Sequence, residues 1–260
     1  MAVPAPVRSG FRVSGPDEVP VVYDHPPLVE AWLVVNFQEG GESLAKNATA
    51  LRERLGPEWS ERWREAPHLA SPAGLQLTNV MGDRALRLNQ HGFAFGWLGH
   101  GGERYPRYES VRDGFVAVLD AVRSLDADTV QVPRHWEVRY VNRIPQGTVW
   151  STPDDWSFFS LWNVQSMKSL GIDPVGAQAQ WQLPLDCERG TLIVEFRHQQ
   201  DSVETGDCVW INLHVSGAVE EGESGLFDGF DFGREVIVRS FNELVSPVAK
   251  SYWGVASRPR

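Results

Sequence analysis

The stretch VPRHWEVRYVNRIP, residues 132–145, decides the fold. Its polar and apolar side chains alternate, as they do along a β-strand whose successive residues point to opposite faces of a sheet. Prolines at both ends bound the extended run. One face carries Trp136, Val138, Tyr140 and Asn142, and the other carries His135, Glu137, Arg139, Val141 and Arg143. The stretch therefore predicts an interior strand with one largely apolar face and one charged face.

The charged face supplies the candidate binding residues. Glu137 and Arg139 are two residues apart, so they point the same way and can pair, and Arg143 extends the row. An arginine in a covered strand is held by a carboxylate or by an anionic ligand. Two interpretations are therefore open, a structural Arg–Glu network and a ligand site. With Trp136 and Trp97 these three residues form the set of candidate ligand- or partner-binding residues.

Before this strand, the pattern of apolar residues predicts one strand and helix, then three short strands and an amphipathic helix. Trp59 and Trp63, four residues apart, predict a short helix between the two groups. Residues 1–26 are rich in proline and predict an extended arm. The predicted elements are a strand at 28–37, a helix at 42–55, strands at 75–80, 84–90 and 93–98, and a helix at 105–125.

After Pro145 the pattern blurs through 146–176, where residues 156–170 are compatible with a strand or a short helix. Alternation then returns, and it predicts three more strands, an acidic loop and a closing helix. These elements are strands at 177–185, 191–199 and 208–216, the loop GAVEEGESG at 217–225, and a helix at 230–248.

The two halves share an order of strand, excursion, three-strand meander and long helix. This order predicts an α+β fold of two related lobes, each an antiparallel sheet with a long helix packed on one face. The predicted lobes cover residues 27–130 and 131–254, with a continuous core, and residues 255–260 form a tail.

Charge and composition exclude several classes of function. The chain of 260 residues has a formal net charge of −10 and no run of Lys and Arg, which disfavours binding to a phosphate backbone. No window approaches the ~18 apolar residues of a membrane helix. The two cysteines, Cys187 and Cys208, and the absence of a signal-peptide pattern predict a cytoplasmic protein. The eleven tryptophans fit either a core or an aromatic-lined pocket or interface.

Motifs for metal, cofactor and nucleophile chemistry are missing from the sequence. The histidines form no HxxxH or HxH pair, the cysteines form no CxxC, and there is no GxSxG elbow. The glycine-rich run at 96–102 lies between a strand and a helix, but it lacks the GxGxxG and GK[ST] patterns of phosphate loops. We therefore expect no metal and no cofactor, and no residue receives a catalytic role.

Four short motifs resemble a family of bacterial proteins. They are Pro26-Pro27-Leu28-Val29-Glu30, Tyr105-Pro106 with Tyr108, the run Glu137 to Ile144, and Tyr252-Trp253-Gly254. The third resembles the family's Arg-Tyr-x-Asn-x-Ile strand. The family is sporadically distributed, uncharacterised and of about this length, and the likeness covers residues 26–254. It implies the same order of elements and no established activity or cofactor. Its patchy distribution resembles that of accessory or defence-type genes.

Two functions are expected from these observations. The first is a non-catalytic binding or regulatory protein that engages a protein partner or self-associates, because aromatics are abundant and no catalytic motif is assembled. The alternative is an enzyme or small-ligand sensor with a pocket between the central sheet and the long helix, lined by Trp136 or by Arg139 and Arg143.

Overall fold

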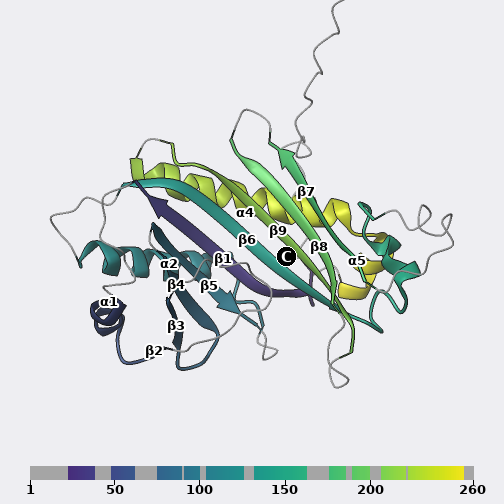
Figure 1. Cartoon of the computed structure of the whole chain (residues 1–260), viewed down its shortest axis with the longest axis horizontal. Helices are drawn as coiled ribbons and strands as arrows, with labels where there is room; N and C mark the ends of the chain where they lie inside the picture. Colours follow the sequence, from purple (N-terminus) through teal and green to yellow (C-terminus); the bar gives the residue numbers. More distant parts are fainter. Residues whose placement is uncertain are drawn as a thin grey trace, which may run out of the picture. The chain divides into compact units, whose positions relative to one another are not determined.

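The fold is described from a computed structural model, which is informative for residues 23–38, 48–61, 75–89, 91–99, 104–125, 132–162, 176–185, 189–199, 206–220 and 222–254. It is an α+β protein with a large antiparallel sheet and several helices (Figure 1). The chain divides into two compact units. We name them the β1 unit (residues 28–142 and 218–233) and the β7 unit (residues 1–27, 143–217 and 234–260). Their bounds differ from those of the two predicted lobes.

The β1 unit holds six antiparallel strands, and their spatial order is β2-β3-β4-β5-β1-β6. Leu33 of β1 lies opposite Phe95 of β5 on one side and opposite Val138 of β6 on the other, so β1 is paired along both edges. The strands are β1 (Leu28–Phe37), β2 (Trp59–Glu61), β3 (Leu75–Asn79), β4 (Arg84–Leu88), β5 (Gly92–Leu98) and β6 (Pro133–Pro145). The predicted strand at 132–145 is confirmed as β6, which pairs with β1.

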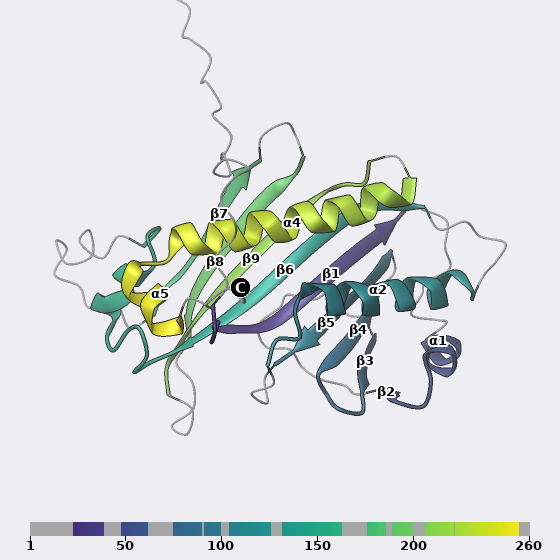
Figure 2. The same cartoon turned by 180° about the vertical axis from the view of Figure 1, so that it is seen from behind.

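Two helices pack on the apolar side of these strands, which Figure 2 turns toward the viewer. Helix α2 (Tyr108–Arg123) buries the stripe that its spacing predicted, and Phe115 stacks on Phe93 of β5 with ring centroids 4.9 Å apart. Phe230, from the first part of α4 (Gly222–Leu244), meets the edge of Phe115 at 4.9 Å. A shorter helix, α1 (Ala48–Leu55), precedes β2.

The β7 unit holds three antiparallel strands, β7 (Gln178–Pro184), β8 (Thr191–Gln199) and β9 (Cys208–Ala218), in the order β7-β8-β9. The predictions for these three strands are confirmed within one or two residues. A 3₁₀ helix, η2 (Pro153–Phe158), and a short C-terminal helix, α5 (Pro247–Trp253), complete the unit.

The start of α4 corrects one prediction. The expected acidic loop at 217–225 is wrong in its second half, because α4 begins at Gly222. The glycines of α4 obscure this helix in the sequence. In the structure, two of them have a packing role. A Cβ at Gly229 would lie 2.5 Å from Nε1 of Trp136, and one at Gly233 would lie 2.8 Å from Cζ3 of the same indole. Close approach to Trp136 therefore favours glycine at these two positions of α4, both of which follow the predicted loop.

Three further predictions meet the structure in part. Trp59 lies in strand β2 opposite Asn79 instead of in a helix, because the β3 edge offers it backbone partners; Trp63 lies outside the described residues. The closing helix ends at Leu244, and Pro247 begins α5, as expected of a proline at the first position of a helix. Of the predicted arm, residues 1–22 lie outside the described ranges, whereas Asp24 N–H donates to the Gly254 carbonyl at 3.1 Å.

Candidate functional site

The ion pair predicted on the charged face of β6 is present. One carboxylate oxygen of Glu137 accepts from Nε of Arg139 at 2.9 Å and from Nη2 at 2.5 Å. The two side chains are 17% and 25% exposed, so the pair is largely shielded from water. A charge-assisted pair in this setting neutralises the arginine within the chain. The geometry thus favours the structural interpretation of Arg139.

Trp32 and Arg87 belong to the same face, and sequence reasoning missed both. The Arg87 guanidinium lies over the Trp32 ring with its carbon 4.0 Å from the ring centroid, and Trp32 Nε1 donates to Oε2 of Glu30 at 2.7 Å. A Cβ at Gly96 of β5 would lie 2.5 Å from the Trp32 indole. The indole can pack against β5 here because residue 96 is a glycine. Alternation along β4 predicts which face of the sheet Arg87 occupies only when the order of the strands is known. The sequence did not provide that order.

The electrostatics of Arg87 link these groups. Burial lowers the pKa of the Arg87 guanidinium; Glu30 raises it, and Arg139 lowers it. Nε of Arg87 also donates to Oε1 of Gln76 at 3.0 Å. We call Glu30, Trp32, Arg87, Glu137 and Arg139 the arginine face. It contains two guanidinium groups and two carboxylates, so the face is close to charge balance.

Trp136 and Trp97 lie in the buried layer instead. Trp136 is 3% exposed and its Nε1 donates to the carbonyl of Ala218 at 3.0 Å. Trp97 is 1% exposed and meets Tyr105 edge-on at 5.2 Å. By strand alternation both point away from Glu137 and Arg139. The five candidate residues therefore do not come together as one site.

Arg143 belongs to the β7 unit and is half-buried. Its backbone N–H donates to the carbonyl of Pro27 at 2.9 Å. The expectation that it joins Arg139 in one binding row stays a prediction.

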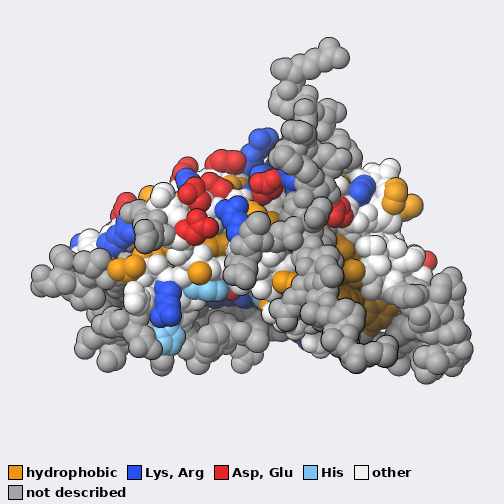
Figure 3. All heavy atoms as spheres, turned by 90° about the horizontal axis from the view of Figure 1, so that it is seen from above, with side chains coloured by type: hydrophobic (Ala, Val, Ile, Leu, Met, Phe, Trp, Pro, Cys, Tyr) orange, Lys and Arg blue, Asp and Glu red, His pale blue; other side chains and the backbone are white. Residues whose placement is uncertain are grey.

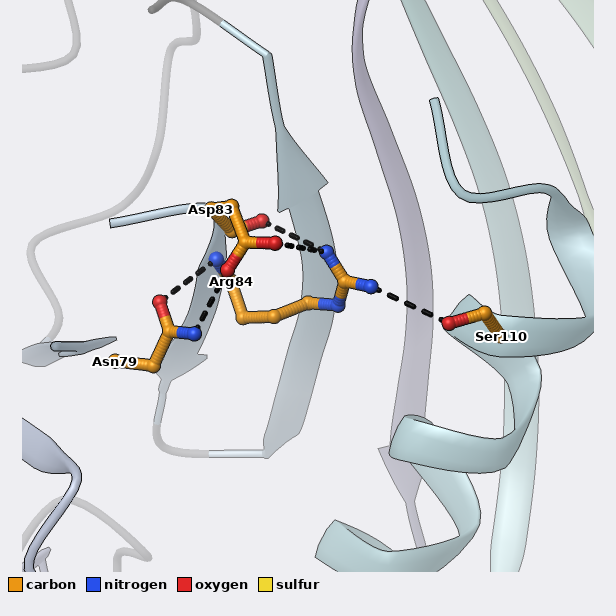
Figure 4. Close-up of polar contacts among 4 residues, drawn as sticks. All are labelled: Asn79, Asp83, Arg84 and Ser110. Atoms are coloured by element: carbon orange, nitrogen blue, oxygen red, sulfur yellow. Dashed lines mark hydrogen bonds and ion pairs between the residues drawn. The ribbon is translucent and has the colours of Figure 1, made fainter. Parts of the chain in front are cut away.

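Two polar clusters of the β1 unit hold helix α2 in place. In the turn between β3 and β4, Nδ2 of Asn79 donates to Oδ1 of Asp83. Beside this turn, Nη2 of Arg84 donates to Oγ of Ser110 in α2 at 3.3 Å (Figure 4). Near the start of α2, the Tyr108 hydroxyl donates to Asp231 at 2.7 Å. Burial, then this hydrogen bond, raises the pKa of Tyr108 above its ordinary value of 10.0. Both clusters are internally satisfied and have an architectural role.

The β7 unit gathers most of its aromatic side chains in one cluster. Trp162 stacks on Phe196 at 4.9 Å, and Trp156 meets the His198 ring at 5.0 Å. Nε2 of His198 lies 3.3 Å from Oδ2 of Asp207. Trp156 and Phe196 are fully buried, so the cluster forms a core, as one of the two interpretations of the tryptophans predicted.

Strand β7 is the most open feature of the described structure. Its sequence is QAQWQLP, without a charged residue, and its exposure alternates along its length. Gln178, Gln180 and Gln182 are exposed, while Ala179, Trp181 and Leu183 are half-buried. Within the described ranges β8 is its only hydrogen-bonded neighbour. Among the residues that the structure describes, no strand lies beside the outer edge of β7.

The hydrogen-bond pattern shows which groups these are. His198 N–H donates to the Ala177 carbonyl at 2.8 Å, and Leu185 N–H donates to the Gly190 carbonyl at 3.0 Å. Paired residues of an antiparallel ladder alternate between bonded and non-bonded positions. Odd-numbered residues of β7 therefore bond to β8, and Gln178, Gln180 and Gln182 direct both N–H and C=O outward. Pro184 directs only a carbonyl outward.

Apart from the proline at its end, Pro184, this edge lacks the usual protection of exposed strands. Lysines, inward-pointing charges and bulges normally prevent an edge from pairing with another chain. Residues 178–184 contain none of these charges, and their register with β8 is unbroken from Gln178 to Pro184. The sequence signal was present in the alternating glutamines of 178–182, but strand order was needed to show that they lie at an edge.

In the face drawn in Figure 3, Lys and Arg side chains are interspersed with Asp and Glu instead of forming one basic area. No helix in the described part of the chain is long and apolar enough to cross a membrane. No cluster of three or more His, Cys, Asp or Glu side chains suited to a metal ion occurs among the residues described. No family model, curated protein or solved structure matches the chain.

Proposed function

We propose that this chain is a non-catalytic binding protein that takes up an extended polypeptide as an additional strand along β7. The observation that supports the proposal is the uncharged edge of residues 178–184, with outward N–H and C=O groups at Gln178, Gln180 and Gln182. Strand addition obtains affinity from main-chain hydrogen bonds and specificity from alternate side chains.

The side chains of β7 define the kind of strand that fits. One side of β7 presents three glutamines, and the other presents the half-buried Ala179, Trp181 and Leu183. Pairs of neighbouring side chains on adjacent strands stabilise a sheet when both are apolar or both are polar. A fitting segment therefore alternates polar and apolar residues and carries no charge that the glutamines would leave unpaired. A nucleic acid lacks the main-chain groups that this edge requires.

The proposal is tested with a displayed library of random short peptides, selected against the purified full chain. Enriched peptides should alternate polar and apolar residues. They should bind the Gln180→Pro variant at least about tenfold more weakly, because proline removes an outward N–H that the added strand needs. Proline is tolerated at an edge strand where its nitrogen faces outward, so the variant should fold.

Gln180→Ala is the matched control. It removes the same side chain but keeps the N–H, and it should bind the selected peptides within about threefold of the original chain, a difference of well under 1 kcal/mol. Urea unfolding of both variants establishes that they are folded. Peptides that bind Gln180→Pro as tightly as Gln180→Ala, or a selection without enrichment, would contradict strand addition at β7.

We also propose that the two halves of the chain are related by duplication. The order of elements supports this: β3, β4 and β5 are followed in the chain by α2, and β7, β8 and β9 are followed by α4. An experimental structure in which these two runs fail to superpose would contradict it.

A further inference from the structure

We infer that the strand taken up by β7 is β7 of a second copy of this chain, paired antiparallel about a two-fold axis at Gln180. The inference rests on the function proposed above and names its partner. A two-fold interface brings the same surface of each copy together, so the surface must complement itself. Three properties of β7 meet that condition.

The first property is the spacing of its outward groups. With the axis at Gln180, this residue lies opposite itself, and Gln178 lies opposite Gln182 of the second copy. All of these residues direct N–H and C=O outward. Each opposed pair can therefore exchange two hydrogen bonds, as in an ordinary antiparallel ladder. Every outward N–H of residues 178–182 obtains an acceptor.

The second property is the fit of the side chains. The same register places Trp181 opposite Ala179 of the second copy, so each large indole meets a small methyl group. The glutamines of both copies lie on one side of the extended sheet, where their amides can bond to one another. The half-buried apolar side chains of both copies, Ala179, Trp181 and Leu183, lie on the other side of the extended sheet.

The third property is the absence of charge. The chain carries a net charge of −10, so two copies repel each other in general. Residues 178–184 contribute nothing to that repulsion, because none of them is ionisable. The edge is thus a place where two copies can approach closely without opposing like charges.

The position of Pro184 selects this register over its neighbour. An axis at Trp181 would place Gln178 opposite Pro184 of the second copy, and the Gln178 carbonyl would then face a residue without an N–H. An axis at Gln180 places the missing N–H of Pro184 opposite Gly176, which lies outside β7, so that the N–H and C=O groups of Gln178, Gln180 and Gln182 can all be paired.

A seven-residue strand on its own makes a small interface. Interfaces at the low end of the size range belong to weak and transient complexes, so we expect a reversible dimer with a dissociation constant on the order of micromolar.

Sedimentation velocity of the full chain over a wide range of concentration tests the inference. The original chain and Gln180→Ala should show a monomer–dimer equilibrium, and Gln180→Pro should lower the association constant at least about tenfold. Hydrogen exchange at the amides of Gln178, Gln180 and Gln182 should slow as the dimer forms. A chain that stays monomeric, or a dimer that persists in Gln180→Pro, would overturn the inference.

The register has its own test, in a background with Cys187→Ser, since the other cysteine, Cys208, is buried. A short reagent that joins two thiols should link Gln180→Cys to itself efficiently, because the two Cα atoms are expected about 5.5 Å apart. Gln182→Cys, which faces Gln178 of the second copy, should link far less. Equal linking of the two variants would overturn the axis at Gln180.

The outcomes separate this inference from the proposed function. A monomeric chain that binds selected peptides through Gln180 overturns the self-pairing alone. A chain that neither dimerises nor binds peptides overturns both. A monomer whose three outward amides are already protected at the lowest concentration means that another segment of the same chain occupies the edge, which also overturns both.

Discussion

Strands β1 and β7 are both extended runs, but they differ in how many of their edges are paired. β1 is bonded to β5 on one side and to β6 on the other, whereas β7 is bonded to β8 on one side within the described structure. Every backbone group in the middle of β1 therefore has a partner. In β7 every second residue directs its backbone groups outward.

The side chains follow the same division. Polar residues around β1 are shielded and hydrogen-bonded: buried Glu30 accepts from Trp32, and half-buried Glu137 accepts from Arg139. The polar residues of β7 are exposed glutamines that carry no charge. The comparison teaches that charge in this protein is used to stabilise the interior of the sheet, while the open edge is kept neutral and able to pair.

A proline exchange gives the largest expected contrast. Val34→Pro in β1 should destabilise the fold by at least about 3 kcal/mol, because Val34 lies between Ala94 of β5 and Glu137 of β6, and proline removes its ladder N–H and leaves a carbonyl inside the sheet without a donor. Gln180→Pro should cost the monomer less than about 1 kcal/mol, because its N–H points outward. Urea unfolding at low concentration measures both. Equal losses would mean that β7 is an interior strand as well.

A tryptophan exchange should give a smaller contrast. Trp32→Ala should lower the free energy of unfolding by about 3–5 kcal/mol. The indole is 2% exposed, contacts the Arg87 guanidinium and donates a hydrogen bond to Glu30, and all of these interactions are lost. Trp181→Ala should cost about 2 kcal/mol or less, since this ring is half-buried and meets Phe159 at 5.9 Å. Thermal and urea unfolding of the two variants, compared at the same pH, provide the measurement. A larger loss for Trp181 would break the division into interior and edge.

The smallest expected effect concerns the Glu137–Arg139 pair. A double-mutant cycle with Glu137→Gln and Arg139→Ala should give a coupling energy of about 1 kcal/mol, because both side chains are largely shielded. The i,i+4 pair Glu235–Arg239 of α4, at 2.7 Å, has a carboxylate that is 46% exposed; it is the comparison pair and should give about 0.3–0.5 kcal/mol. Added salt should reduce the coupling energy of Glu235–Arg239 more than that of Glu137–Arg139. It should not weaken association through β7, which carries no charge.

The cycle also decides between the two interpretations of Arg139. If Arg139→Ala leaves the free energy of unfolding unchanged, the arginine is not needed for the fold, and a role in ligand binding gains support. A loss that matches the loss in Glu137→Gln identifies a structural pair.

Much of the local structure could be predicted from the sequence. The strand β6, the stripe of α2 and the three strands of the β7 unit all follow from periodicity, which depends on neighbours within a few residues. The contact between Glu137 and Arg139 was predictable for the same reason, since residues two apart on a strand share a face. The stacking of Arg87 on Trp32 was not, because the two residues lie on strands separated in space by β5.

The sequence by itself determined most of the strands and helices, which face of β6 is charged, and that residues 178–184 alternate without charge. Only the tertiary structure decided that β1 lies inside the sheet and β7 at its edge, that Trp97 and Trp136 belong to the core, and that glycines of α4 make room for Trp136. The physical reason is range. Alternation is a property of neighbouring residues, whereas the order of strands depends on backbone pairing between segments far apart in the chain.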